Sequence, residues 1–73
     1  MDVVKLFNEA RKIKHSGISA ESIKLHSEDK EYIYFTFYYG FDYEEIVRIS
    51  KKDKAYCTDN ILTIGNIKIE VYL

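Results

Sequence analysis

Residues 31–45 read EYIYFTFYYGFDYEE, and this aromatic stretch decides the fold. The letters predict a strand over 31–39, a turn at Gly40, Phe41 and Asp42, and a second strand over 43–50. Successive side chains of a strand point to opposite faces, so only half of these rings can enter one core. The other half must lie on the opposite face of the sheet.

The register of the neighbouring strands follows from the requirement that paired apolar residues share a face. A strand over 21–27 joins the central strand through a loop of Glu28, Asp29 and Lys30, which predicts Leu25 opposite Ile33 and Ile23 opposite Phe35. The loop after the central strand predicts Phe35 opposite Val47 and Ile33 opposite Ile49. Both hairpins therefore agree on which face is inside.

The last third of the chain predicts three further strands, over 54–58, 61–64 and 67–72. Gly65-Asn66 suits a two-residue hairpin turn between alternating apolar residues, with Leu62 facing Ile69. Asp59-Asn60 marks the preceding turn. Cys57 alternates with Tyr56 and is expected to point inward.

The first segment predicts an α-helix over about residues 2–15. Apolar residues recur there at steps of three and four, which is one stripe of a helix. Asp2 is a candidate N-cap, and Gly17 stands where a left-handed residue would end the helix. The apolar stripe consists of Val3, Leu6, Phe7, Ala10 and Ile13.

The predicted architecture is α+β, with an N-terminal α-helix packed on a curved five- to six-stranded antiparallel meander in one domain, 1–73. One helix is too narrow to cover six flat strands, so the sheet must curl, approach closure, or bury its face on a second copy. The side chains expected inside are Ile23, Leu25, Ile33, Phe35, Phe37, Val47, Ile49, Leu62, Ile64, Ile67, Ile69 and Val71.

The outer face of the aromatic sheet is the first candidate binding surface. The register places Tyr34 between Lys24 and Arg48, and Tyr32 across from His26. Aromatic and Arg side chains are enriched where protein interfaces gain affinity. The alternative is a solvated sheet face with ordinary cross-strand pairs. The candidate partner-binding residues are Tyr32, Tyr34, Tyr38, Arg48, Lys24, His26 and Ile46.

Two acidic turns are the second candidate surface. Carboxylates there could meet a basic groove on a nucleic-acid enzyme, and in size and style the chain is similar to small phage and mobile-element proteins that inhibit host enzymes. Solvated turn residues are the alternative, since charged side chains are common in turns. The candidate acidic contacts are Glu28, Asp29, Glu31, Asp42, Glu44 and Glu45.

Composition limits the function classes. The chain has 73 residues, 11 basic and 12 acidic side chains, and a formal net charge of −1, so no global field attracts nucleic acid. One Cys and two His suggest neither a zinc site nor a nucleophile with its base. No cofactor, metal or catalytic residue is expected, nor a membrane segment, and we expect a cytoplasmic protein.

The sequence therefore predicts a small non-enzymatic protein-binding module, such as an inhibitor or accessory protein, with homodimerisation left open. The alternative function is binding of single-stranded RNA or DNA, with bases stacked on the same rings.

Overall fold

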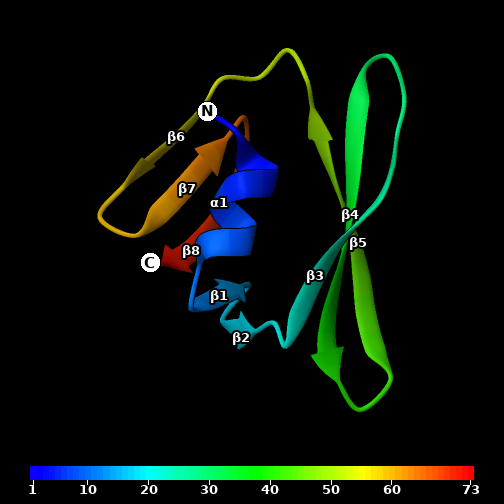
Figure 1. Ribbon diagram of the computed structural model, residues 1–73, viewed down its shortest axis with the longest axis vertical. Helices are drawn as coiled ribbons and strands as arrows, with labels where there is room; N and C mark the ends of the chain where they lie inside the picture. Colours follow the sequence, from blue (N-terminus) through cyan, green and yellow to red (C-terminus); the bar gives the residue numbers. More distant parts are fainter.

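Two antiparallel sheets and one short helix make up the computed structural model, which describes residues 1–73 (Figure 1). The helix lies beside the five-stranded sheet, and the three-stranded sheet faces them from the other side. In chain order the elements are α1 (Val3–Glu9), β1 (Lys12–His15), β2 (Ile18–Ser19), β3 (Ser22–Glu28), β4 (Tyr32–Gly40), β5 (Tyr43–Ser50), β6 (Ala55–Thr58), β7 (Ile61–Ile64) and β8 (Ile67–Tyr72).

The strands do not form the single meander that the sequence predicted. One sheet has the order β3-β4-β5 and the other the order β2-β1-β8-β7-β6. The chain leaves the first sheet after Ser50 and starts the second at Ala55, while β1 returns to pair with β8 at the far end of the sequence. The coarser expectation, a mostly antiparallel fold with one helix, is confirmed.

The core lies between the two sheets, so the second sheet of the same chain covers the apolar face that one helix is too narrow to cover. Inward side chains of β4 and β5 face those of β1, β7 and β8, and the helix adds one ring. Phe7 meets Phe35 and Phe37 edge-on, at centroid distances of 5.1 and 5.8 Å. The buried hydrophobic residues are Phe7, Ile13, Phe35, Phe37, Tyr39, Val47, Ile49, Leu62, Ile64, Ile69 and Val71.

The predicted helix is wrong over its second half. Asp2 does cap its start, accepting a hydrogen bond from the Lys5 amide at 3.1 Å, but the helix ends at Glu9. Residues 12–15 form β1, and Ile13 pairs with Val71 of β8. Ile13 fits a helical stripe and an alternating strand equally well, and pairing with the edge of β8 decides between them. Gly17 belongs to the β1–β2 turn instead of a helix end.

The register is as predicted for β4–β5 and β7–β8, where Phe35 pairs with Val47 and Leu62 with Ile69. In the β3–β4 pair it is shifted, because Leu25 pairs with Phe35 and a β-bulge follows before Ser27. Leu25 was expected inside but is 50% exposed. It lies on an edge strand, and the core cluster reaches Ile23 without extending to Leu25.

Gly65 shows why the β7–β8 turn needs glycine. Its φ is +60°, a conformation that side chains with a Cβ rarely adopt. A Cβ at this position would also collide with the carboxylate of Asp53. The turn therefore fixes the register that brings the buried Leu62 and Ile69 together.

Candidate functional site

The outer face of the three-stranded sheet carries most of the predicted binding residues. We call it the tyrosine face and define it by Lys24, Tyr32, Tyr34, Tyr38, Ile46 and Arg48. Figure 1 shows no element on this side of β3, β4 and β5. The three Tyr side chains are half-buried among their neighbours, whereas Ile46 is 54% exposed.

Contacts within the tyrosine face hold its rings in place. The guanidinium carbon of Arg48 lies 4.2 Å from the centroid of the Tyr32 ring, a close cation–π contact. The Tyr32 and Tyr34 rings are 6.3 Å apart and tilted by 52°. The Tyr34 hydroxyl donates a hydrogen bond to Asp29 Oδ2 at 3.2 Å. These contacts reduce the side-chain freedom that a partner would otherwise have to restrict.

Two predicted members of the face lie elsewhere than expected. Lys24 pairs with Thr36 across the strands, and its ammonium lies 5.7 Å from the Tyr38 ring instead of beside Tyr34. His26 falls at the β-bulge and has no cross-strand partner, so it does not face Tyr32. The predicted pairing of Tyr34 with Arg48 is confirmed.

The first acidic turn, between β3 and β4, uses its carboxylates internally. Asp29 Oδ1 accepts hydrogen bonds from the backbone amides of Glu31 and Tyr32, at 2.8 and 2.7 Å. These two hydrogen bonds lower the pKa of the Asp29 carboxyl, and the one from the Tyr32 amide has the larger effect. Glu28 forms an ion pair of 2.8 Å with Lys51. Only Glu31 keeps a carboxylate with no partner in the protein.

The second acidic turn, between β4 and β5, keeps Asp42 and Glu44 exposed and without side-chain hydrogen bonds or ion pairs. Glu45, predicted to belong with them, points instead toward the core side. Phe41, at the tip of this turn, is fully exposed. The sequence placed Phe41 in the loop but assigned it no role, although a bulky ring is unusual where turns favour Gly, Asn or Asp.

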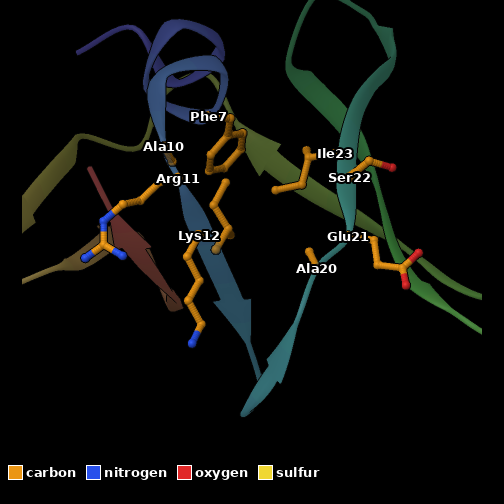
Figure 2. Close-up of a pocket in the computed structure, with 9 residues that line it drawn as sticks. Phe7, Ala10, Arg11, Lys12, Ala20, Glu21, Ser22 and Ile23 are labelled. Carbon is orange, nitrogen blue, oxygen red and sulfur yellow. The ribbon is translucent and has the colours of Figure 1, made fainter.

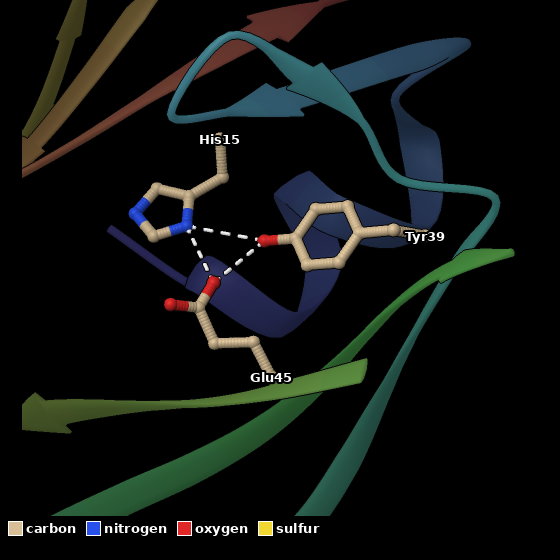
Figure 3. Close-up of polar contacts among 3 residues, drawn as sticks. All are labelled: His15, Tyr39 and Glu45. Carbon is tan, nitrogen blue, oxygen red and sulfur yellow. Dashed lines mark hydrogen bonds and ion pairs between the residues drawn. The ribbon is translucent and has the colours of Figure 1, made fainter. Parts of the chain in front are cut away.

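Glu45 joins a polar cluster that links the two sheets (Figure 3). Tyr39 donates a hydrogen bond of 2.7 Å to Glu45 Oε1, and His15 Nδ1 lies 3.0 Å from the same oxygen. His15 comes from β1, whereas Tyr39 and Glu45 come from β4 and β5. No sequence signal predicted this contact, because it depends on how the sheets face each other.

The chemistry of this cluster is that of a structural link. Burial raises the pKa of the Tyr39 hydroxyl well above its usual range, and the hydrogen bond to the Glu45 carboxylate raises it further. The hydroxyl therefore stays protonated and remains a donor. The Tyr39 hydroxyl in turn lowers the pKa of Glu45. None of the three side chains lines a hollow that could admit a substrate. The arrangement joins the two sheets at one end of the interface between them.

A small hollow opens where β1 and β3 part beside the helix (Figure 2). Its floor is apolar, with Phe7, Ile13 and Ile23. The polar side chains that line it extend away from it in Figure 2, so none is aimed inward to orient a ligand; they are Arg11, Lys12, Glu21 and Ser22. This hollow offers little specificity.

No cluster of three or more His, Cys, Asp or Glu side chains is arranged to hold a metal ion. The only helix, α1, is far too short to cross a membrane. No protein-family model matches the chain, and neither a curated protein nor a solved structure is significantly similar to it. The functional argument therefore depends on the surfaces themselves.

Proposed function

We propose that this protein is a non-enzymatic binding module that holds a protein partner on its tyrosine face. The observation that supports this is an uncovered sheet face on which Ile46 is 54% exposed beside three Tyr rings and Arg48. Tyr and Arg are typical of interface centres because each removes a large area from water while keeping a polar group available.

Preorganisation adds to the proposal. Arg48 lies on the Tyr32 ring and Asp29 holds the Tyr34 hydroxyl, so these side chains are ordered without a partner. Association costs free energy for every mobile side chain that must be fixed. A face whose side chains are already ordered binds a partner at a lower entropic cost than a face with mobile side chains.

The same contacts favour a protein over single-stranded nucleic acid. A base would have to stack on a Tyr ring, but the Arg48 guanidinium already covers one face of Tyr32. Asp29 places a carboxylate at Tyr34, and Glu44 pairs with Tyr38 across the strands. These two acids offset the charges of Lys24 and Arg48, so the face attracts phosphates weakly.

The test compares two exposed apolar side chains of equal exposure. Ile46→Ser changes the tyrosine face, whereas Tyr56→Ser changes β6 of the other sheet, and both residues are 54% exposed. We would capture proteins from source-cell lysate on each immobilised variant, quantify them by mass spectrometry, and measure the affinity of each purified candidate. A partner that Ile46→Ser loses and Tyr56→Ser retains supports the proposal. Equal retention by both variants contradicts it.

The alternative function has a direct test of its own. Labelled single-stranded RNA and DNA of about 20 nucleotides would be titrated at two salt concentrations and followed by fluorescence anisotropy. Saturable binding that weakens with salt and is lost in Arg48→Ala would replace the protein-binding proposal with nucleic-acid binding. Sedimentation of the free protein tests whether the partner is a second copy.

A further inference from the structure

The tip of the β4–β5 hairpin forms a second surface, which adjoins the tyrosine face and shares Tyr38 with it. A shallow hollow there is lined by three aromatic side chains and three carboxylates. Glu21, just before β3, reaches the hairpin from the side, and its carboxylate lies against Gly40. The residues that line the hollow are Glu21, Tyr38, Gly40, Phe41, Asp42, Tyr43 and Glu44.

Phe41 is the unusual residue of this tip. Its φ is +54° and that of Asp42 is +62°, so both occupy the left-handed region. Two other hairpins have positive φ angles at Ser16-Gly17 and Asp59-Asn60, and of these residue types Gly, Asp and Asn tolerate that conformation well. A bulky ring in this conformation is strained, and because Phe41 is fully exposed its ring gains no burial in return. Folding gives no reason for a Phe at this position.

The rings beside Phe41 leave aromatic surface open to solvent. Tyr43 stacks on Tyr39 at a centroid distance of 5.2 Å, which fixes one side of its ring, and it remains 55% exposed. Lys24 lies over the Tyr38 ring at 5.7 Å, an intramolecular instance of the cation–π contact that such rings make. No cation of the protein covers the Phe41 or Tyr43 ring in this way.

The carboxylates around these rings are also unengaged. The side chains of Glu21, Asp42 and Glu44 accept no hydrogen bond and join no ion pair. Three negative charges beside open rings repel phosphates and anionic lipid headgroups and attract a cation. Cation–π attraction and charge attraction then act on the same ligand group.

We infer that the β4–β5 tip binds a Lys- or Arg-bearing segment of a protein partner. A guanidinium or ammonium group lies against the Phe41 and Tyr43 rings while Asp42 and Glu44 balance its charge. This surface extends the proposed binding function, since tip and tyrosine face belong to the same sheet. The two are tested by different residues, so one proposal can fail without the other.

The test uses acetylated penta-arginine amide as the probe and penta-citrulline, its neutral isostere, as the control ligand. The ¹⁵N-labelled protein would be titrated with each peptide and followed by backbone amide chemical shifts. We expect saturable shifts at residues 40–44 with penta-arginine and none with penta-citrulline. Equal shifts with both peptides would overturn the inference.

Three variants separate this site from general attraction to acidic residues. Phe41→Ser and Asp42→Asn should each weaken binding about fivefold, the order expected from losing one cation–π or charge contact. Glu31→Gln is the matched control, because it removes one unpartnered charge at the other hairpin end, where no ring is fully exposed. Equal weakening by Glu31→Gln and Asp42→Asn, or unchanged affinity in Phe41→Ser, would refute the inference.

A second copy of the chain is the competing occupant. Sedimentation of the wild-type protein without peptide would reveal self-association. Self-association that Phe41→Ser abolishes, in a protein that does not bind penta-arginine, would overturn the cationic ligand in favour of a homotypic contact.

Discussion

The two ends of the three-stranded sheet are both acidic hairpin turns, yet they use their charges differently. At the β3–β4 end, Asp29 accepts hydrogen bonds from two backbone amides and from the Tyr34 hydroxyl. Glu28 forms an ion pair with Lys51. At the β4–β5 end, Asp42 and Glu44 have no partners and Phe41 is fully exposed. Only Glu31 lacks a partner at the first end, whereas only Glu45 has one at the second. Most of the carboxylates therefore stabilise the fold at one end, and most remain unpartnered at the other.

The largest expected effect comes from truncating a core side chain of β4, the strand that both ends share. Phe37 is fully buried in β4 and meets Phe7 edge-on. Phe37→Ala should lower the free energy of unfolding by about 3–5 kcal/mol, because it leaves a cavity in the core. Phe41→Ala makes the same chemical change at the exposed tip and should stay within about 0.5 kcal/mol of wild type. Urea unfolding of both variants measures the contrast, and similar losses would contradict the assignment of Phe41 as a surface residue.

The next effect separates the two acidic ends. Asp29→Ala removes the acceptor of the Glu31 and Tyr32 amides and should lower the thermal midpoint by several degrees. Glu44→Ala breaks no side-chain hydrogen bond or ion pair, lies in ordinary strand backbone of β5, and should leave the midpoint nearly unchanged. Thermal unfolding followed by circular dichroism compares them. A larger loss in Glu44→Ala would reverse the roles given to the two turns.

Acid should sharpen the same contrast. The native pKa of Asp29 lies below its ordinary value of 3.8, so the charged carboxylate stabilises the folded state above that pH, and this stabilisation is lost as pH falls through the lowered pKa. Asp29→Asn should thus be less stable than wild type at pH 6 and approach it at about pH 2. The lowered pKa of Glu45 affects both proteins alike and cancels from the difference. A stability difference that is independent of pH would contradict this account.

The smallest effect has the opposite sign. Phe41→Asn places a residue that tolerates the left-handed region at φ +54°, and should raise the free energy of unfolding by about 1 kcal/mol or less. The same change should weaken binding of the arginine peptide. Denaturant unfolding checks the first expectation and the amide titration checks the second. Lower stability in Phe41→Asn would show that the ring supports the turn.

What the sequence predicted well was local. The Gly65-Asn66 turn, the pairing of Phe35 with Val47 and the pairing of Tyr34 with Arg48 follow from alternation and short loops, and the structure has them. These choices involve neighbours in sequence, and a slip of one residue would expose a whole apolar set.

What the sequence missed was non-local. Ile13 satisfies both the helical and the strand period, so only contact with β8 shows that residues 12–15 are a strand. Likewise, nothing in the separate segments places His15 against Glu45, because that contact exists only once two sheets face each other. For the candidate binding surface, strand alternation correctly placed Tyr32, Tyr34 and Arg48 on one face, whereas the β-bulge displaced His26.

The pairing of β1 with β8 also sets an order for folding. The β3-β4-β5 sheet consists of successive hairpins, which close short loops and can form early in folding. The five-stranded sheet needs residues 12–15 and 67–72 together, so its completion closes a much longer loop and should be slower. During that interval the inner faces of β4 and β5, including Phe35 and Phe37, have no second sheet to cover them. A chain in which only the three-stranded sheet has formed is therefore the state most exposed to aggregation.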